Sequence, residues 1–303
     1  MNNLLEFNDV RRFYGRSCAL SGVTFSIPAG GVTALLGPNG AGKSTALRTA
    51  VNLIQPTGGQ VSILGTPSTK IGPEQLRQIG YVADGMELPM WMTVDQFLNW
   101  CRPLYPAWDK DLEARLRKDF NLPGDRRLRD LSRGQRMKAA LLSNLAYRPK
   151  LVILDEPFSG LDPIMRDEFI SGLLELSEQE DWALVISSHD IEEVQKLADR
   201  VVVLQEGKVT LAESMDGLME RHRQVEVYFP DDSKHAPGLP CTWQEVQQAG
   251  RILRFVDGAY DEPQLAADIL HHLPGAESHT TKSLTLREIF IHLVRTGKIA
   301  VGA

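Results

Sequence analysis

Short runs of consecutive apolar residues recur through the first two thirds of the chain. They occupy residues 32–36, 79–82, 151–154 and 183–186, and more polar stretches separate them. Strands of a parallel sheet are covered on both faces, so their side chains are apolar without alternation. Residues 44–52, which follow the first run, read as a helix. The pattern therefore predicts an α/β fold around a mostly parallel core sheet.

Alternation of apolar and polar residues marks both ends of this region. Residues 4–27 alternate in short runs that Gly15 and Gly22 break, which predicts N-terminal antiparallel strands. Residues 201–204 and 208–211 flank a Glu-Gly pair and predict a closing hairpin. Antiparallel strands are thus expected before and after the predicted parallel sheet, within residues 4–27 and 201–211.

Between the second and third apolar runs, residues 93–147 follow a helical period instead. Val94, Phe97 and Leu98 are spaced to share one helix face, so we expect a helical insertion in the α/β fold. Aromatic residues gather at its start, and two interpretations stay open. They form a small core of the insertion, or they line an exposed groove for a partner's helix. These aromatic residues are Trp91, Trp100, Tyr105 and Trp108.

The last third of the chain reads as a small α+β domain. Strands are expected near residues 224–229 and 251–256, and a helix over residues 264–273. A final helix around residues 286–294 carries four apolar residues at helical spacing, so it should dock by one face.

Composition limits what such a protein contacts. A formal charge of −6 and an isoelectric point near 5.7 exclude a general basic surface, and no nucleic-acid partner is expected. Three well-separated cysteines, Cys18, Cys101 and Cys241, argue against a disulfide framework or a zinc site and indicate a reducing compartment. No apolar run is long enough to cross a membrane. The 303 residues suffice for two domains, which we place at 1–215 and 216–303.

One stretch carries a specific chemical pattern. Residues 37–45 read Gly-Pro-Asn-Gly-Ala-Gly-Lys-Ser-Thr and fit G-x-x-x-x-G-K-[ST] between a buried strand and a helix. Glycines let the backbone curl until its N–H groups point at phosphate oxygens, where a Cβ would block the approach. The helix N-terminus adds partial positive charge. Lys43 can reach the β- and γ-phosphates, and Ser44 can bind Mg²⁺.

Charged and titratable side chains end two later strands. Asp155 and Glu156 follow the third apolar run, and His189 follows the fourth. The carboxyl ends of parallel strands meet at the edge where α/β sheets bind ligands. Asp155 suits the Mg²⁺ shell, and Glu156 suits a general base for attacking water. His189 is placed to donate a hydrogen bond to a γ-phosphate oxygen.

Two further features have ordinary structural explanations as well. Ser132 lies in the sequence Leu-Ser-Arg-Gly-Gln, residues 131–135, and is a suitable N-cap for a helix that runs to about residue 147. That cap is by itself a complete explanation. Tyr14 precedes Gly15, and its ring either stacks on a purine or is an ordinary aromatic at a strand end.

In this order, the motifs resemble those of the nucleotide-binding subunit of ABC transporters, over residues 4 to about 215. The motif names that the resemblance supplies are Walker A for 37–45, the signature for 131–135, Walker B for 151–155 and the D-loop for 159–162. The nucleotide-binding residues that it implies are Tyr14, Gly37, Pro38, Asn39, Gly40, Ala41, Gly42, Lys43, Ser44, Thr45, Ser132, Gly134, Gln135 and Asp162. The implied catalytic residues are Glu156 and His189, and the implied metal ligands are Ser44, Asp155 and Asp84.

The resemblance implies a P-loop NTPase cassette that uses ATP and Mg²⁺. Two cassettes, in a homodimer or a heterodimer, would pack head to tail with each ATP between one Walker A motif and the other subunit's signature. Hydrolysis would drive an integral membrane permease on a separate chain, from the cytoplasmic face of the cell membrane. Tails like residues 216–303 occur on ATPase subunits of exporters, so we expect export and interpret the tail as an accessory or regulatory domain.

Two other functions are weighed against transport. A soluble ABC ATPase acting on ribosomes or DNA usually carries two cassettes, a long coiled coil or a zinc insertion, whereas this chain has one cassette and no sustained heptads. The third interpretation is a regulator that binds a nucleotide without hydrolysing it. The aspartate at residue 84 keeps this interpretation open.

Two positions depart from the family pattern. Residue 84 is aspartate where a glutamine that touches Mg²⁺ and signals to the membrane subunit is usual. Aspartate is a competent oxygen ligand but a shorter, charged one. Arg133 replaces the first glycine of the signature. It either adds a cation near the phosphates bound by the other subunit or occupies a surface position.

Overall fold

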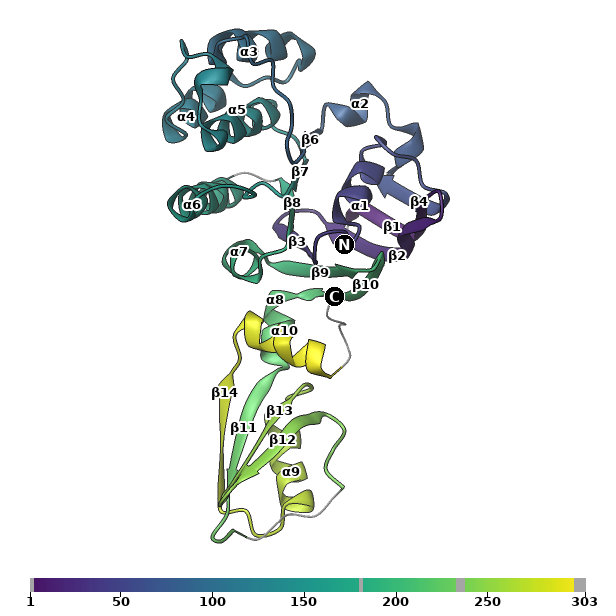
Figure 1. The fold of residues 1–303 in the computed structure, drawn as a ribbon, viewed down its shortest axis with the longest axis vertical. Helices are drawn as coiled ribbons and strands as arrows, with labels where there is room; N and C mark the ends of the chain where they lie inside the picture. Colours follow the sequence, from purple (N-terminus) through teal and green to yellow (C-terminus); the bar gives the residue numbers. More distant parts are fainter. Residues whose placement is uncertain (1–2, 180–181, 233–237, 297–303) are drawn as a thin grey trace. The chain divides into compact units, whose positions relative to one another are not determined.

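The computed structural model describes residues 3–179, 182–232 and 238–296 and divides into two compact units, Met1–Ala212 and Glu213–Ala303. Figure 1 shows the elements of both units. Each unit has its own hydrophobic core and is described by itself.

Within the described residues, the first unit is built on a six-stranded sheet in the order β10-β9-β3-β8-β7-β6. Its strands are β3 (Val32–Leu36), β6 (Ile79–Val82), β7 (Leu151–Asp155), β8 (Ala183–Ser188), β9 (Arg200–Gln205) and β10 (Lys208–Ser214). Strands β6, β7, β8, β3 and β9 pair in parallel. In β7, Ile153 faces one hydrophobic core and Leu154 the other, so both faces need apolar side chains. The predicted mostly parallel sheet is confirmed.

The N-terminal strands form a separate antiparallel sheet in the order β2-β1-β4-β5. Its strands are β1 (Asn3–Tyr14), β2 (Ser17–Pro28), β4 (Gly58–Ile63) and β5 (Thr66–Pro67). The expectation that Gly22 breaks these strands is wrong, because β2 runs through it. Gly22 has a φ of 79°, and the register with β1 shifts between Val10 and Arg11. A glycine at positive φ lets the strand bulge and continue.

The predicted helical insertion lies between β6 and β7. It consists of α3 (Val94–Cys101), η2 (Arg102–Leu104), α4 (Lys110–Asp119), η3 (Leu128–Asp130) and α5 (Arg133–Leu145). The core interpretation is confirmed for two of its aromatic residues, and the groove for a partner's helix stays a prediction. Tyr105 stacks on Tyr147 with ring centroids 3.8 Å apart, and Trp108 packs against the core. Trp91 and Trp100 are 69% and 58% exposed.

Helix α1 (Lys43–Ala50) covers one face of the core sheet, and α6 (Pro163–Gln179) and α7 (Ile191–Leu197) cover the other (Figure 1). The first unit also contains the short helices η1 (Ser68–Lys70) and α2 (Pro73–Leu76). The strand register pairs Leu36 with Ser188 and Asp155 with Ser187. The carboxyl ends of β3, β7 and β8 therefore adjoin at one edge of the sheet.

The second unit is α+β, as the sequence predicts. Its antiparallel sheet has the order β12-β13-β11-β14. Its elements are α8 (Met215–Glu220), β11 (Arg223–Tyr228), β12 (Trp243–Ala249), β13 (Ile252–Asp257), α9 (Glu262–His272), β14 (Ser278–Ser283) and α10 (Leu286–Arg295). The sequence interpretation missed β12 and β14, since both are mostly polar and exposed and so lack the apolar alternation of a strand. No helix in the described ranges combines the length and hydropathy of a membrane span.

Candidate functional site

The predicted phosphate-binding loop joins the end of β3 to the start of α1. Gly42 is the N-cap residue of α1, with a φ of 106° and no side-chain cap. The N–H groups of a helix's first turn have no partner within the helix, and here no side chain caps them either. Backbone donors and the positive end of the helix dipole therefore face outward at Lys43 and Ser44, as an anion site requires.

Gly37 and Gly42 are required by the packing of the loop. This corrects the expectation that a Cβ at these positions would block an approaching phosphate. A Cβ on Gly37 would lie 2.1 Å from the carbonyl oxygen of Leu204, and one on Gly42 would lie 2.5 Å from that of Ala19. These glycines therefore let the loop pack against neighbouring backbone. Only Gly40, at a φ of 81° with nothing within 4 Å of an added Cβ, matches the expectation of an open approach.

Lys43 is buried and turns back over its own loop. Its Nζ donates to the carbonyl oxygens of Gly37 at 2.7 Å and Pro38 at 3.2 Å. The same ammonium forms an ion pair with Oε1 of Glu156 at 2.9 Å. A buried ammonium must be paired, so this arrangement holds the lysine at the mouth of the loop. The structure thus brings the predicted phosphate-binding lysine and the predicted base into contact.

Asp155 lies at the centre of the cluster with no solvent exposure. Its Oδ1 accepts hydrogen bonds from Ser44 Oγ at 2.9 Å and from Ser187 Oγ at 2.7 Å. Its Oδ2 is buried and has no hydrogen-bond partner among the described residues. A buried carboxylate oxygen without a donor is costly unless a cation satisfies it. The oxygen set of Ser44 and Asp155 is therefore suited to Mg²⁺.

Glu156 follows Asp155 in a strained backbone conformation, with a φ of 48°. Its N–H donates to Ser187 Oγ at 2.8 Å, and its Oε2 lies 2.9 Å from Nδ1 of His189. Left-handed conformations of non-glycine residues cluster at functional sites. Because Lys43 contacts Oε1 and His189 contacts Oε2, the Glu156 carboxylate is held from two sides.

Ser187 is a residue that the sequence interpretation missed. Its hydroxyl, fully buried, joins the Asp155 side chain to the Glu156 backbone. The available signal was its position at the carboxyl end of an apolar run, two residues before His189. Serine is common at strand ends, so its chemical type alone did not mark it.

The structure places other predicted binding residues in local roles. Ser132 Oγ accepts from the N–H of Gln135 at 3.1 Å, and the Gln135 side chain accepts from the N–H of Ser132, a capping box at the start of α5. Asp162 Oδ1 accepts from the N–H of Met165 at the start of α6. Gly134 is buried against Met165. The predicted contacts of these residues with a nucleotide stay predictions.

Tyr14 and Asp84 complete the predicted set. The Tyr14 ring is 45% exposed, and the Arg12 guanidinium lies 4.7 Å from its centroid. Asp84 Oδ1 lies 3.5 Å from Nη2 of Arg133. Stacking on adenine by Tyr14 and metal ligation by Asp84 stay predictions.

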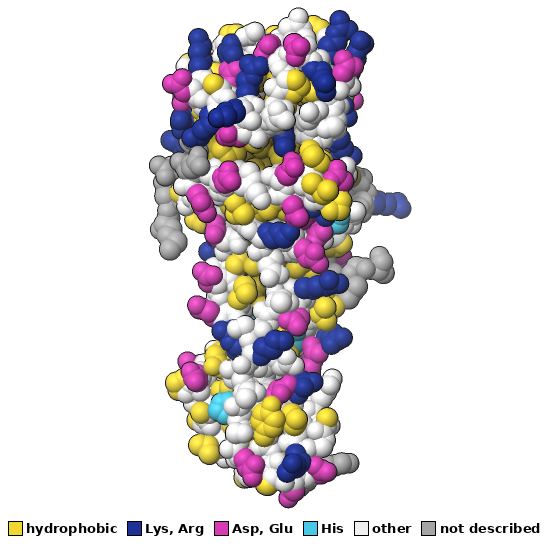
Figure 2. Space-filling view, turned by 90° about the vertical axis from the view of Figure 1, so that its left-hand side faces the viewer, with side chains coloured by type: hydrophobic (Ala, Val, Ile, Leu, Met, Phe, Trp, Pro, Cys, Tyr) yellow, Lys and Arg dark blue, Asp and Glu magenta, His cyan; other side chains and the backbone are white. Residues whose placement is uncertain are grey.

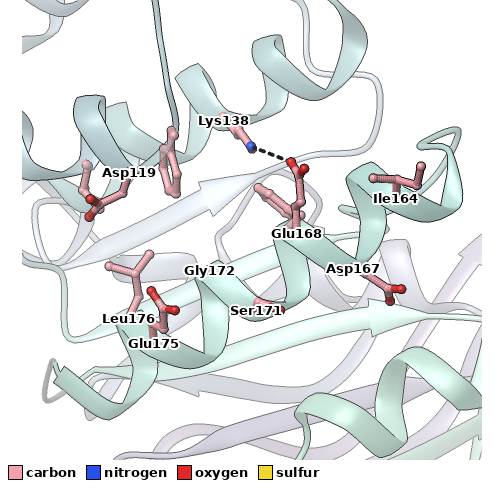
Figure 3. A pocket seen from close by; sticks show the side chains of 12 residues that line it. Asp119, Lys138, Ile164, Asp167, Glu168, Ser171, Gly172, Glu175 and Leu176 are labelled. Carbon is pink, nitrogen blue, oxygen red and sulfur yellow. Dashed lines mark ion pairs between the residues drawn. The ribbon is translucent and has the colours of Figure 1, made fainter.

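A cavity of about 620 Å³ lies elsewhere in the first unit, between α4, α5 and α6. Figure 2 shows the hollow with hydrophobic side chains at its floor, and Figure 3 shows the ion pair between Lys138 and Glu168 across it. Leu116 and Phe169 lie among the apolar residues that line it, and none of the predicted site residues does. Size alone therefore does not identify the site, whereas the convergence of charged groups at the sheet edge supports the predicted one.

Comparisons with known proteins agree with this geometry. Residues 20–159 match the family described as "ABC transporter". The sulfate/thiosulfate import ATP-binding protein CysA of Burkholderia mallei is 33% identical over 233 residues, which cover 74% of this chain and 66% of that protein. The chain spans 59–66% of the length of the first curated relatives that it matches.

Solved structures are similar over the same region. The ATP-binding subunit of an ABC transporter superposes with a TM-score of 0.64 at 27% identity, over 72% of this chain and 92% of that one. The dimeric bacterial ABC transporter cassette MJ0796 gives a TM-score of 0.62 at 25% identity, over 70% of this chain and 98% of that one.

Proposed function

We propose, since the chain belongs to the family of ABC transporter ATP-binding domains, that it hydrolyses Mg·ATP to drive a membrane permease on a separate chain. The observation that carries the proposal is the buried Asp155 carboxylate. Ser44 and Ser187 hold one of its oxygens, and the other accepts no hydrogen bond among the described residues. The same few residues bring Lys43, Glu156 and His189 together.

Each side chain of the site has a role that its contacts support. Backbone N–H groups at the start of α1 and the Lys43 ammonium bind and orient the phosphates. Ser44 and Asp155 would hold Mg²⁺, which would supply positive charge to neutralise the phosphates. Glu156 accepts a proton from the attacking water, and His189, 2.9 Å from it, orients its carboxylate.

We further propose that two copies of this cassette, or this cassette and a similar one, sandwich two ATP molecules head to tail. The N-terminus of α5 supports this, because Ser132 is its N-cap, Gly134 lies in its first turn, and helix N-termini bind phosphate groups. A cassette of 25% identity is described as dimeric.

The sandwich predicts that Glu156→Gln traps a dimer, because ATP binds but is not cleaved. Light scattering of the purified variant should give twice the monomer mass with Mg·ATP and the monomer mass with Mg·ADP. Adding Lys43→Ala to the same chain is the control that should abolish the dimer. A monomer at saturating ATP would contradict the head-to-tail arrangement.

For the permease, exposed apolar side chains support a docking surface at the entrance to the helical insertion. Met86 and Met90 are 44% and 42% exposed and line a groove with Arg136 and Met137. Interfaces are enriched in methionine and aromatic residues. Met90→Arg should reduce recovery of an integral membrane protein with the tagged chain, whereas Leu53→Arg, an exposed position outside the groove, should not. Equal recovery from both variants would place the partner elsewhere.

The direction of transport and the partner on which the ATPase acts are the finer parts of the proposal. The curated relative is named as an import protein, so the expectation of export finds no support in the comparisons. ATP-driven uptake or release by inside-out vesicles that contain the complex would decide the direction. Action on ribosomes or DNA is not favoured by these relatives. We propose a cytoplasmic location at the inner face of the membrane, and an accessory role for residues 216–303, of which 233–237 and 297–303 lie outside the described residues.

A further inference from the structure

The two residues that depart from the family pattern lie against each other. Arg133 Nη2 is 3.5 Å from Asp84 Oδ1, and each side chain is about half exposed. Asp84 lies in the loop that leads from β6 into the helical insertion, and Arg133 is the first residue of α5. One ion pair therefore joins two segments that are far apart in the sequence.

The Arg133 guanidinium also covers the turn after β7. A Cβ on Gly160 would lie 2.5 Å from Nη1 of Arg133 and 2.8 Å from its Cζ, and Gly160 has a φ of 69°. This turn begins at Glu156 and ends at Asp162, which caps α6. Arg133 thus contacts the loop after β6 and the turn that carries the base.

We propose that Arg133 is a positioning residue for the reaction, and that Asp84 serves as its counter-ion instead of as a ligand of Mg²⁺. Arg133 fixes the N-terminus of α5, which is the predicted phosphate-binding end, relative to the turn at Gly160. The proposal rests on the proposed function, because it assigns roles within that site.

The chemistry of the pair explains why the two departures occur together. An arginine in the signature brings a cation whose planar group can contact a carboxylate and a backbone turn at once. Aspartate at residue 84 neutralises that cation, which the usual glutamine would not do. Asp84 has no contact with Ser44 or Asp155 among those described in residues 3–179, whereas its contact with Arg133 is present.

The test compares Asp84→Asn, Arg133→Gln, the double variant, and the charge swap Asp84→Arg with Arg133→Asp. Arg129→Gln is the matched control, because it removes a similarly exposed arginine that pairs only with its neighbour Asp130 among the described residues. Both single variants should lower kcat about two- to fivefold, the range of a partly exposed ion pair. The double variant should lose no more than Arg133→Gln alone. The swap restores the ion pair but not the guanidinium at Gly160, so its kcat should exceed that of Arg133→Gln without reaching the wild type. The Mg²⁺ concentration for half-maximal rate should stay within twofold throughout.

A metal role for Asp84 gives the opposite result. Asp84→Asn would then raise the half-saturating Mg²⁺ concentration tenfold or more, Arg133→Gln would not, and the charge swap would be the least active variant. Additive losses in the double variant would also overturn the proposal.

A second readout separates this proposal from the proposed function. Hydrogen exchange without nucleotide should become faster in residues 83–90 for Arg133→Gln and in residues 131–140 for Asp84→Asn, and not for Arg129→Gln. If the wild-type chain releases no phosphate but these exchange changes appear, the ion pair stands and the ATPase function fails. Unchanged exchange in both single variants would overturn the ion pair itself.

Discussion

At the scale of single residues, two adjacent carboxylates are prepared for different work by their neighbours. Asp155 is fully buried, and serine hydroxyls hold one of its oxygens, which leaves the other for a cation. Glu156 is placed by a positive φ and lies between the Lys43 ammonium and the His189 ring. Their environments thus suit the two neighbouring acids to the proposed metal-binding and base functions.

Ser187→Ala tests the buried hydroxyl that supports both acids. It removes a hydrogen bond to a carboxylate, a contact typically worth about 1.5–3 kcal/mol. We expect kcat for ATP hydrolysis to fall about tenfold or more, with little change in the affinity for ATP without metal. Ser143→Ala removes another buried serine hydroxyl, away from the site, and should leave kcat unchanged. Equal kcat in the two variants would contradict the role of Ser187.

Tyr14→Ala tests the predicted adenine stacking. Loss of an aromatic–base stack typically costs about 1–3 kcal/mol, so the dissociation constant for ATP should rise by the corresponding factor. Tyr14→Phe keeps the ring and should bind like the wild type. Calorimetric titration with ATP would measure both. Wild-type affinity in Tyr14→Ala would return this residue to the role of an ordinary aromatic at the end of β1.

At the scale of elements, the helical insertion contains a buried charge that ties two of its helices together. Glu113 in α4 is 3% exposed and accepts hydrogen bonds from Arg102 Nε at 2.8 Å and Trp108 Nε1 at 2.8 Å. Burial alone would raise the pKa of Glu113, but the hydrogen bonds from Arg102 and Trp108 outweigh it, and the pKa lies below its ordinary 4.5.

Because the folded pKa of Glu113 is depressed, its contribution is present above the unfolded value near 4.5 and is lost as pH falls below it. Glu113→Gln should lower the free energy of unfolding by about 2–3 kcal/mol at pH 7. Urea unfolding followed by tryptophan fluorescence should show this difference shrinking below pH 4.5. Glu175→Gln, at an exposed position of α6, is the control. A difference independent of pH would refute the ion-pair account.

Elements with one clear signal could be predicted from the sequence, and those with mixed signals could not. The strands β3 and β7 are buried on both faces, so their continuous apolar sequence predicts a position inside the core sheet. By contrast, β14 is a polar edge strand that pairing with β11 holds in the sheet, which no local pattern records. Ser132 shows a third case, because the same residue is both a helix cap and a predicted ligand contact.

Most contacts between distant segments could not be predicted from the sequence either. The phosphate loop, Asp155 and Glu156 were predictable because strand ends of a parallel sheet share an edge. The pairing of Asp84 with Arg133 and the bridge made by Ser187 depend on how loops fold back, and single-residue patterns do not specify this.

At the scale of the whole molecule, the two compact units divide the work that we propose. The first carries all the predicted nucleotide and metal residues, and the second has its own core around β11, β13 and α9. If the second unit is accessory, then ATP hydrolysis depends on the first unit. The rate of hydrolysis should then depend on the Glu156 carboxylate.

The most direct test is steady-state phosphate release by the purified chain with Mg·ATP, with the wild type, Glu156→Gln and Glu178→Gln compared side by side. Loss of a general base typically lowers the rate by about 10²–10⁴-fold. We therefore expect Glu156→Gln to fall at least a hundredfold while it still binds ATP, and Glu178→Gln, at an exposed position of α6, to match the wild type. If Glu156→Gln keeps more than a tenth of the wild-type rate, or the wild type releases no phosphate, the proposed catalytic role is contradicted.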